Sequence, residues 1–572
     1  MANSIGESHA TTIDPFIADT RIAYFSMEIA LRPEIHTYSG GLGILAGDTA
    51  RSSADLELPM VFVTLASREG YLRQEIDGKG RQVDHPDPWN PEKHAVPLPA
   101  MAAVQIEGRR VWIRPWLYVL TCPTEHRIPV ILLDTDVAGN EARDRSITAR
   151  LYGGDQVHRL MQEIVLGIGG ERVLQALGFR ISTFHLNEGH AALLTVSLLR
   201  QHRRASGYPG SAKLYDPDPV RDQCVFTTHT PVEAGHDQFE YALSERLLGD
   251  FIETETLKLF AGTERLNMTR LALNLSGYVN GVARRHAETT SRMFPGYRIR
   301  AVTNGVHVPT WTHLAFAELF QGIAPNWGHE PEILARADQL SDAEIWAAHT
   351  RAKGELLQVV NDRTGVSLDR DLPIIGFARR MTGYKRPELL FSDLDRLRTM
   401  AEDKPFQIIL AGKAHPQDGG GKTAIEQIHR HLAQLAGSVA GVFLPNYDFA
   451  LARHLICGVD VWLNTPVPPL EASGTSGMKA ALNGVLNLSV LDGWWVEAWI
   501  EGVTGWAIGA DGDQPDRHAD ALYEQLENKI LPLYARNRPQ WIWMMKESIS
   551  KVGSQFTSQR MMRRYASEAY LR

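Results

Sequence analysis

Five short apolar segments of the carboxyl-terminal half indicate the fold class of the chain: PIIGFAR (373–379), QIILAG (407–412), VFLPNY (442–447), VDVWLN (459–464) and VLNLSVLD (485–492). Segments with helical periodicity lie between them: ELLFSDLDRLRTMAE (388–402), AIEQIHRHLAQLA (424–436), DFALARHLICG (448–458) and GMKAALNG (477–484). Continuous apolar strands that alternate with helices are typical of a parallel sheet covered on both faces. We therefore predict an α/β fold.

The amino-terminal half carries a second set of apolar segments, with a helical pattern at 155–178 among them. These predicted strands are RIAYFSME (21–28), MVFVTLA (60–66), VWIRPWLYVL (111–120), VILLDTD (130–136), STFHLNE (182–188), CVFTTHT (224–230) and IRAVTNG (299–305). Two α/β units fit this pattern, with a boundary after TNGVHVPTW (303–311). We expect domains at 1–311 and 312–548, and a last helix at 549–572 that packs back on the first domain.

Length and composition agree with a large globular protein. The chain has 572 residues, of which 44% are hydrophobic and 22% are charged, so it can bury a sizeable core. Its formal net charge is −8. General binding to nucleic acid requires many Lys and Arg that neutralise phosphates, so this acidic balance argues against a nucleic-acid partner.

The cysteine pattern and the hydropathy indicate a reducing compartment. The three cysteines, Cys122, Cys224 and Cys457, form neither a disulfide framework nor a CxxC metal site. The start MANSIGESHATTID lacks the basic and apolar regions of a secretion signal. No run approaches the ~18 apolar residues that cross a bilayer. We expect a cytoplasmic protein with no membrane partner and no bound metal.

Polar residues stand at or soon after the ends of predicted strands in both halves. In open α/β sheets, ligands bind beyond the carboxyl ends of the strands. Residues from two domains at such positions predict one shared cleft between them. These residues are Glu28, Glu188, His229, Asn304, Arg380 and Glu471.

Three motifs resemble nucleotide or metal sites but depart from the required spacing. SGGLGILAG (39–47) has its third glycine one residue too late for a dinucleotide fingerprint, which leaves a plain turn or an anion site at a helix start. GGGKT (419–423) has Pro416 where a phosphate loop requires glycine. HLNEGH (185–190) spaces its histidines by five rather than four, which favours a polar strand end in an active site over a zinc site.

Two motifs carry stronger chemistry. ARRMTGYKR (378–386) places four cations around a turn after an apolar strand, so it forms either a solvated basic face or a site for phosphate. EASGTSGMKAALNG (471–484) opens a helix with small residues and carries Lys479 on the first turn. Such a position disfavours the ammonium form, as a lysine that condenses with an aldehyde requires, although most lysines at helix starts are merely solvated.

Together these segments resemble the α-glucan phosphorylases, the glycogen and maltodextrin phosphorylase family, and particularly its short bacterial branch. The similar stretches run in family order from about residue 23 to 495. They are AYFSMEIA, YSGGLGILAGD, LYGGD, HLNEGHAALL, FTTHTPVEAGHDQF, TNGVHVPTW, FARRMTGYKRPELLF, AGKAHP, NYDFALARHLICGVDVWLNTP and EASGTSGMKAALNGVLNLSVLDGWW.

The resemblance implies two facing Rossmann-like domains of the glycosyltransferase B type, with the active site in the cleft between them. It also implies pyridoxal 5'-phosphate as coenzyme, whose aldehyde Lys479 holds. The residues expected around the coenzyme are Thr475, Ser476, Gly477, Arg379 and Tyr447. The residues expected around substrate phosphate are Arg380, Lys385 and the backbone of Gly41. The residues expected around the glucose are Glu188, His190, His229, Asn304, Glu471, Ser473 and Gly474.

The implied reaction is phosphorolysis of α-1,4-glucans, such as maltodextrin and glycogen, to glucose 1-phosphate with retention, by a homodimer. One alternative is a nucleotide-sugar glucosyltransferase such as a glycogen synthase, which has no reason to carry the Lys479 loop. The other is an inactive glucan-binding protein, in which we would expect Arg380, Lys385 or Lys479 to be lost.

Some segments depart from the long phosphorylases. The link 137–150 is too short for their gate loop, and elements for control by AMP or phosphorylation have no evident counterpart. Ser476 and Gly477 differ from the usual family pair, and WWVEAW (494–499) has no assigned role.

Overall fold

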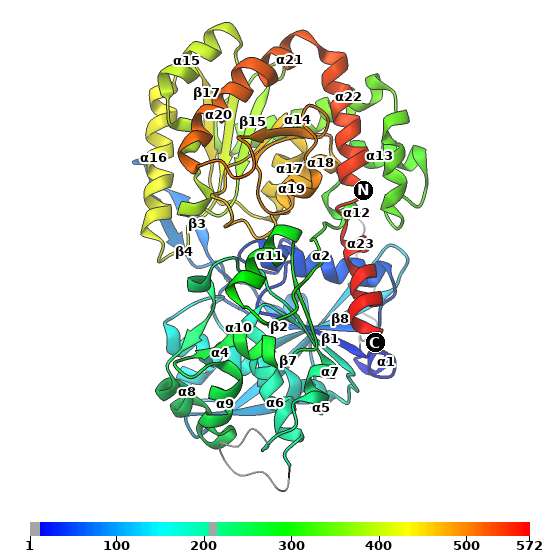
Figure 1. Ribbon diagram of the computed structural model, residues 1–572, viewed down its shortest axis with the longest axis vertical. Helices are drawn as coiled ribbons and strands as arrows, with labels where there is room; N and C mark the ends of the chain where they lie inside the picture. The colour runs from blue at the N-terminus through cyan, green and yellow to red at the C-terminus, as the bar shows by residue number, and fades with distance from the viewer. Residues whose placement is uncertain (1–11, 205–213, 572) are drawn as a thin grey trace.

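The protein was analysed as a computed structural model, which describes residues 12–204 and 214–571. Two separate sheets of mainly parallel strands organise the chain, one in the lower half of Figure 1 and one in the upper half. The mixed α/β class predicted from the alternating segments is therefore confirmed. No helix in the described ranges is both long and apolar enough to cross a bilayer.

The first sheet has ten strands. Seven of them, from β14 at one edge to β8, run parallel to one another. Strand β7 is antiparallel to β8, and both β5 and β6 are antiparallel to β7. In spatial order the strands are β14 (Arg300–Ala301), β13 (Tyr278–Gly281), β10 (Cys224–Thr227), β9 (Thr183–Asn187), β1 (Ile22–Ser26), β2 (Met60–Leu65), β8 (Arg127–Asp134), β7 (Arg109–Thr121) and β5 (Val96–Pro97), with β6 (Ala102–Ile106) beside β7.

The second sheet has six strands, all parallel. In spatial order they are β17 (Ala440–Leu444), β16 (Gln407–Ala411), β15 (Ile374–Ala378), β18 (Val461–Asn464), β19 (Leu486–Val490) and β20 (Gly505–Ile508). Numbered within the sheet, this is the Rossmann order 3-2-1-4-5-6, whose topological switch point lies between β15 and β18. Ligands of such sheets bind at that point, beyond the carboxyl ends of the strands.

Helices cover both sheets (Figure 1). Those that belong to the first half are α1 (Asp14–Ile17), α2 (Gly41–Asp55), α3 (Ala142–Arg145), α4 (Gln156–Ile164), α5 (Gly170–Leu177), α6 (Leu193–Gln201), α7 (Asp218–Gln223), α8 (Tyr241–Leu248), α9 (Thr254–Ala261), α10 (Met268–Asn274) and α11 (Arg284–Met293). Those that follow are α12 (Val308–Trp311), α13 (Leu314–Ile323), α14 (Asp342–Thr364), α15 (Leu394–Asp403), α16 (Gly419–Leu435), α17 (Phe449–Gly458), α18 (Ser476–Leu482), α19 (Trp495–Ala498), α20 (His518–Gln525), α21 (Leu531–Arg536), α22 (Arg538–Ser548) and α23 (Ser558–Tyr565).

All strands of the second sheet except β17, at its edge, are buried along their whole length, which explains their continuous apolar sequences. Every residue of β15, β16, β18 and β19 is buried. Fully burying a Val, Leu or Ile side chain contributes about 1.5–3 kcal/mol, so helices on both faces are needed to remove these strands from water. All five strands predicted in this half are confirmed.

Several elements were not predicted, or were predicted too long. β13 and β20 read YVNG and GWAI, which are too short and too rich in glycine to be recognised as strands. The expected strand 299–305 pairs only over Arg300–Ala301. The expected helix 388–402 divides into a 3-10 turn, Leu389–Phe391, and α15, because Asp393 caps a new helix start by accepting from the Arg396 N–H.

A hairpin of the first half reaches the second sheet. It consists of β3 (Arg73–Ile76) and β4 (Gln82–His85), seen at the left of Figure 1. The Gln82 amide donates to the Ala414 carbonyl at 2.9 Å and accepts from the Ala414 N–H at 2.9 Å. These reciprocal bonds tie the hairpin to the segment that follows β16.

The end of the chain packs against the first sheet. Ser558, the first residue of α23, shares a 2.5 Å hydrogen bond with Ser52 of α2. Further on, the Tyr570 hydroxyl lies 2.6 Å from His185 Nδ1, on strand β9. The chain therefore passes from α22 in the upper half of the molecule to α23 beside the lower half (Figure 1).

Candidate active site

An ion cluster lies at the switch point of the second sheet. Arg379 follows β15 directly, and its Nη2 donates to Glu471 Oε2 at 2.5 Å. The Lys385 ammonium donates to the same oxygen. Burial raises the pKa of the Glu471 carboxyl, but Lys385 and Arg379 outweigh it and lower that pKa to about 2. Glu471 is therefore a charged carboxylate held by two cations.

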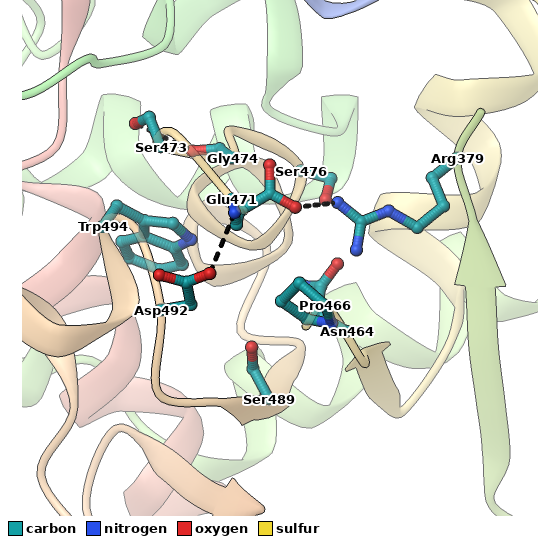
Figure 2. A pocket seen from close by; sticks show the side chains of 10 residues that line it. All are labelled: Arg379, Asn464, Pro466, Glu471, Ser473, Gly474, Ser476, Ser489, Asp492 and Trp494. Carbon is teal, nitrogen blue, oxygen red and sulfur yellow. Dashed lines mark hydrogen bonds and ion pairs between the residues drawn. The ribbon is translucent and has the colours of Figure 1, made fainter. Parts of the chain in front are cut away.

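Arg379 has further buried N–H donors that do not bond to Glu471. Its Nε and Nη1 have no hydrogen-bond partner among the residues that the structure describes. Unpaired buried guanidinium donors are costly in isolation and suit an anionic ligand. Figure 2 shows the pocket around Arg379, whose lining residues are Arg379, Asn464, Pro466, Glu471, Ser473, Gly474, Ser476, Ser489, Asp492 and Trp494.

The loop 471–474 is held by the segment after β19. The Asp492 carboxylate accepts from the Glu471 N–H at 2.9 Å, and the Trp494 N–H donates to the Ser473 carbonyl at 2.9 Å. Burial raises the pKa of Asp492 to about 7. Gly474 has φ +80°, a left-handed conformation that favours glycine. The loop is thus fixed by specific bonds from a neighbouring strand end.

Lys479 lies on α18 in an apolar setting. Its side chain is 6% exposed, and its Nζ lies 3.7 Å from the ring centroid of Trp311. The Trp311 indole N–H donates to Asp48 Oδ2, on α2, at 2.8 Å. Burial lowers the pKa of Lys479 to about 8, although the nearby Asp48 carboxylate opposes this. A larger share of Lys479 than of an ordinary lysine is therefore the neutral, nucleophilic amine at neutral pH.

The residues that open α18 are already engaged by the sheet below. Trp462 donates to Ser476 Oγ at 3.0 Å, and Asn487 donates to the Gly477 carbonyl at 3.0 Å. A Cβ on Gly477 would lie only 2.3 Å from Asn487 Oδ1, so the chain requires glycine there. Thr475 precedes the helix without capping it by its side chain. Tyr447 follows β17, and burial raises the pKa of its hydroxyl.

A glycine turn of the first half faces the cations of the second. Glu28, just after β1, accepts from the N–H groups of Ser39 at 2.5 Å and Gly40 at 3.1 Å. A Cβ on Gly40 would lie 2.8 Å from Arg380 Nη2, whereas the space beside Gly41 is open. Arg380 therefore meets Gly40, the residue before α2, and leaves open space beside Gly41.

The polar strand ends of the first sheet also converge. Glu188, at φ +72°, accepts from the His229 N–H at 2.7 Å, so β9 and β10 are joined beyond their carboxyl ends. His190 Nε2 lies 3.6 Å from Asp237, and burial and the neighbouring Arg159 lower the pKa of His190 to about 3. Asn304 is buried, and its Oδ1 has no hydrogen-bond partner within the described ranges.

Comparison with known proteins gives the family. The model of the carbohydrate phosphorylase family matches residues 222–504. A maltodextrin phosphorylase of Thermococcus litoralis is 38% identical, over 96% of this chain and 70% of that protein. A glycogen phosphorylase of Aquifex aeolicus is 36% identical, over 96% of this chain and 86% of that protein. The chain belongs to the carbohydrate phosphorylase family. The resemblance inferred from the sequence is confirmed.

Further comparison shows that the similarity extends over the full length of a shorter relative. An uncharacterized protein of Methanocaldococcus jannaschii is 30% identical, over 96% of this chain and 99% of that protein.

The expected site residues of this phosphorylase fall into three contact groups. Glu471 joins Arg379 and Lys385; Arg380 adjoins Gly40, which precedes the expected Gly41; Glu188 joins His229. Among the described residues, no side-chain hydrogen bond or ion pair joins Lys479 or Asn304 to these groups.

Sequence reasoning missed three residues that support these groups: Asn187, Trp311 and Asp492. It also missed the hydrogen bonds that Glu28 accepts from the glycine turn. Asp492 ends the apolar segment VLNLSVLD and Asn187 ends HLN, so the signal of a polar residue at a strand end was present. Trp311 could not be found in this way, because it lies on a short helix far from Lys479 in sequence.

A second cavity of this phosphorylase was not predicted. It has a volume of about 420 Å³ and lies beside His190, because its wall residue Asp237 approaches that histidine. Arg159 pairs with Asp237 at 2.9 Å. The lining residues are Gln156, Arg159, Gly235, His236, Asp237, Gln238, Phe239 and Arg265.

Proposed function

We propose that this protein cleaves α-1,4-glucans with inorganic phosphate and releases glucose 1-phosphate with retention of configuration. Relatives named maltodextrin phosphorylase and glycogen phosphorylase support this reaction. The observation that carries it is the meeting of Arg380, which follows β15, with the glycine turn that opens α2. A guanidinium and a turn of backbone N–H groups at a helix start suit a phosphate.

We place the active site in a cleft between two facing Rossmann-like domains of the glycosyltransferase B type. The domains are 1–311 and 312–548, and 549–572 is the helix that returns to the first domain. The 2.8 Å separation between Arg380 Nη2 and the Cβ position of Gly40 supports this placement, because the two residues come from different sheets.

The residues around Lys479 fit pyridoxal 5'-phosphate. Lys479 supplies a buried amine with a pKa of about 8, and Arg379 supplies two unpaired buried donors for an anion. We propose that Lys479 holds the aldehyde and that Arg379 lies near the phosphate. The other residues proposed to surround the coenzyme are Thr475, Ser476, Gly477 and Tyr447. The hydroxyl of Ser476 accepts from Trp462 and still has its own O–H to donate to an anion.

Substrate phosphate does the work of the two carboxylates that glycosidases use. Arg380, Lys385 and the Gly41 N–H hold it against the anomeric carbon. Its proton passes to the glycosidic oxygen, and the bond from that oxygen to the anomeric carbon breaks with the electron pair on the leaving sugar. A phosphate oxygen then bonds to the anomeric carbon from the same face, so the configuration is retained.

The remaining residues orient the sugar. Glu471, Ser473 and Gly474 bind hydroxyls of the reacting glucose, and His229 lies against its anomeric side. Asn304 contributes its unpaired Oδ1 as an acceptor. Glu188 and His190 line the pocket, and the 420 Å³ cavity beside them offers room for the rest of the glucan.

The coenzyme supplies a phosphate group that supports proton transfer to and from the substrate phosphate. Bringing two such anions together is unfavourable, since two unit charges at 4 Å repel by about 4 kcal/mol at an effective dielectric constant of about 20. Arg379, Arg380 and Lys385 provide the positive charge that offsets this repulsion. Lys385 must leave Glu471, or share it, in order to do so.

Product analysis separates this reaction from a nucleotide-sugar transferase on the same fold. The protein reconstituted with pyridoxal phosphate is incubated with maltodextrin, either with phosphate or with a nucleoside diphosphate glucose. We expect glucose 1-phosphate only with phosphate; chain extension from the nucleotide sugar alone would contradict the proposal.

We also propose a cytoplasmic homodimer. Its three cysteines are free and buried, which suits a reducing compartment, and sedimentation would test the dimer.

A further inference from the structure

Three neighbouring strands of the first sheet end in one row. Ser26 of β1 pairs in register with Asn187 of β9, which pairs in register with Thr227 of β10. His229 follows two residues after Thr227. Parallel strands place these ends at one edge of the sheet, so their side chains can form a chain of hydrogen bonds toward His229.

The donor and acceptor in each of these hydrogen bonds follow from the first acceptor, the Glu28 carbonyl. The Ser26 hydroxyl lies 2.7 Å from the Glu28 carbonyl oxygen, which can only accept. The hydroxyl proton of Ser26 is therefore committed, and its oxygen accepts from Asn187 Nδ2 at 3.1 Å. This leaves Asn187 Oδ1, which lies 2.6 Å from His229 Nε2. An amide oxygen can only accept, so Nε2 carries the proton.

The opposite amide orientation is disfavoured by the same contacts. It would turn Asn187 Oδ1 toward Ser26, whose single proton could then satisfy either that oxygen or the Glu28 carbonyl. No other donor to the Glu28 carbonyl exists among the described residues, and one acceptor would remain unpaired in a buried site. Protein interiors avoid such unpaired groups.

His229 is neutral in this environment. Burial lowers its pKa well below the usual value, and the surrounding His286, His185 and His190 act in the same direction. Among the described residues, Glu188 is the one carboxylate bonded to its backbone, and it accepts from the His229 N–H. Since Nε2 holds the one ring proton, Nδ1 carries a lone pair. Nδ1 has no hydrogen-bond partner within the residues described.

We infer that Ser26 and Asn187 hold His229 as the Nε2–H tautomer, so that Nδ1 accepts a hydrogen bond from a hydroxyl of the bound sugar. Asn187 is then a positioning residue, and His229 is the group that touches the ligand. The identity of the ligand rests on the proposed function, whereas the tautomer does not. The other tautomer would present an N–H at the same place, so the sugar hydroxyl could only accept there and would have to donate its proton elsewhere.

Nitrogen chemical shifts of the histidine side chains test the tautomer without any substrate. Full-length protein labelled with ¹⁵N-histidine is measured at neutral pH, and the His229→Gln variant assigns the signals of His229. We expect a protonated Nε2 and an unprotonated Nδ1. A proton on Nδ1 in the wild-type protein would overturn the inference.

Substitutions of Asn187 test its positioning role. Asn187→Ala removes the acceptor, so we expect a mixture of tautomers and about a tenfold rise in KM for glucose 1-phosphate. Asn187→Asp restores an acceptor and should restore the Nε2–H tautomer at high pH. Its carboxylate raises the pKa of His229, so Nδ1 becomes protonated and sugar binding weakens as the pH falls.

The matched control is Asn140→Ala, which removes another buried asparagine of the same half that bonds to the Trp112 and Thr135 carbonyls. It should leave the His229 signals unchanged. Unchanged His229 signals and KM in Asn187→Ala would overturn the inference. If the tautomer is found but the protein releases no glucose 1-phosphate, the tautomer assignment stands and the proposed function fails.

Discussion

Lys479 should destabilise the cofactor-free protein at neutral pH, because its ammonium is buried without a hydrogen-bond partner among the described residues. A pKa lowered from 10.5 to about 8 corresponds to about 3 kcal/mol, at about 1.4 kcal/mol per pKa unit. Below pH 8 the folded state buries the charged form, so the full loss of about 3 kcal/mol in folding stability applies there. Replacing Lys479 by methionine, which has a similar shape and no charge, should restore this stability.

The pH dependence of this gain has a defined sign. Between pH 8 and 10.5 the unfolded state binds more protons than the folded state, so the wild-type protein becomes more stable as the pH rises. The advantage of Lys479→Met should therefore be largest at pH 7 and should fade toward pH 10.5.

Thermal unfolding of the cofactor-free proteins measures the effect. A gain of about 3 kcal/mol corresponds to a rise in Tm of roughly 6–12 °C for a unit of roughly 150–250 residues. The control is Lys529→Met, which removes an exposed lysine paired with Glu501 and should change Tm by little. A Lys479→Met variant that is no more stable at pH 7, or whose gain does not shrink with rising pH, would refute the reasoning.

Three further variants probe the site. Glu471→Gln should lower stability at pH 7, and the difference should disappear as the pH falls through the folded pKa of about 2, as followed by urea unfolding at several pH values. Gly477→Ala should lower Tm and weaken coenzyme retention, because its Cβ would collide with Asn487; wild-type retention would contradict the close approach. Arg380→Ala should raise the KM for phosphate about tenfold or more, since a charge-assisted bond contributes about 1.5–3 kcal/mol, and an unchanged KM would place the phosphate elsewhere.

The second sheet could be predicted from local sequence because its strands are buried on both faces. Such strands read as continuous apolar runs, and the turns between them are polar, so periodicity identifies them without any knowledge of pairing. The strand order could not be read in this way. β15 lies beside β18 rather than only beside β16, and that choice depends on packing between residues that are far apart in sequence.

The charged residues of the site could be nominated from strand ends, but their partners could not. The segment ARRMTGYKR predicts a basic turn. The pairing of Arg379 and Lys385 with Glu471 could not be predicted, because it requires a loop about 90 residues later to fold back onto this turn. The setting of Lys479 depends on Trp311 and Asp48, which come from two other helices. These contacts arise from the tertiary fold, so a motif can suggest the lysine but not its lowered pKa.

Direct observation of the product tests the central claim, that this chain is a phosphate-dependent glucan phosphorylase. Protein reconstituted with pyridoxal phosphate is mixed with maltoheptaose and inorganic phosphate, and the reaction is followed by proton and phosphorus NMR. We predict one α-glucose 1-phosphate for each glucose unit lost, with no reaction in Lys479→Met. Release of free glucose, formation of the β anomer, or cleavage that continues without phosphate would contradict the account.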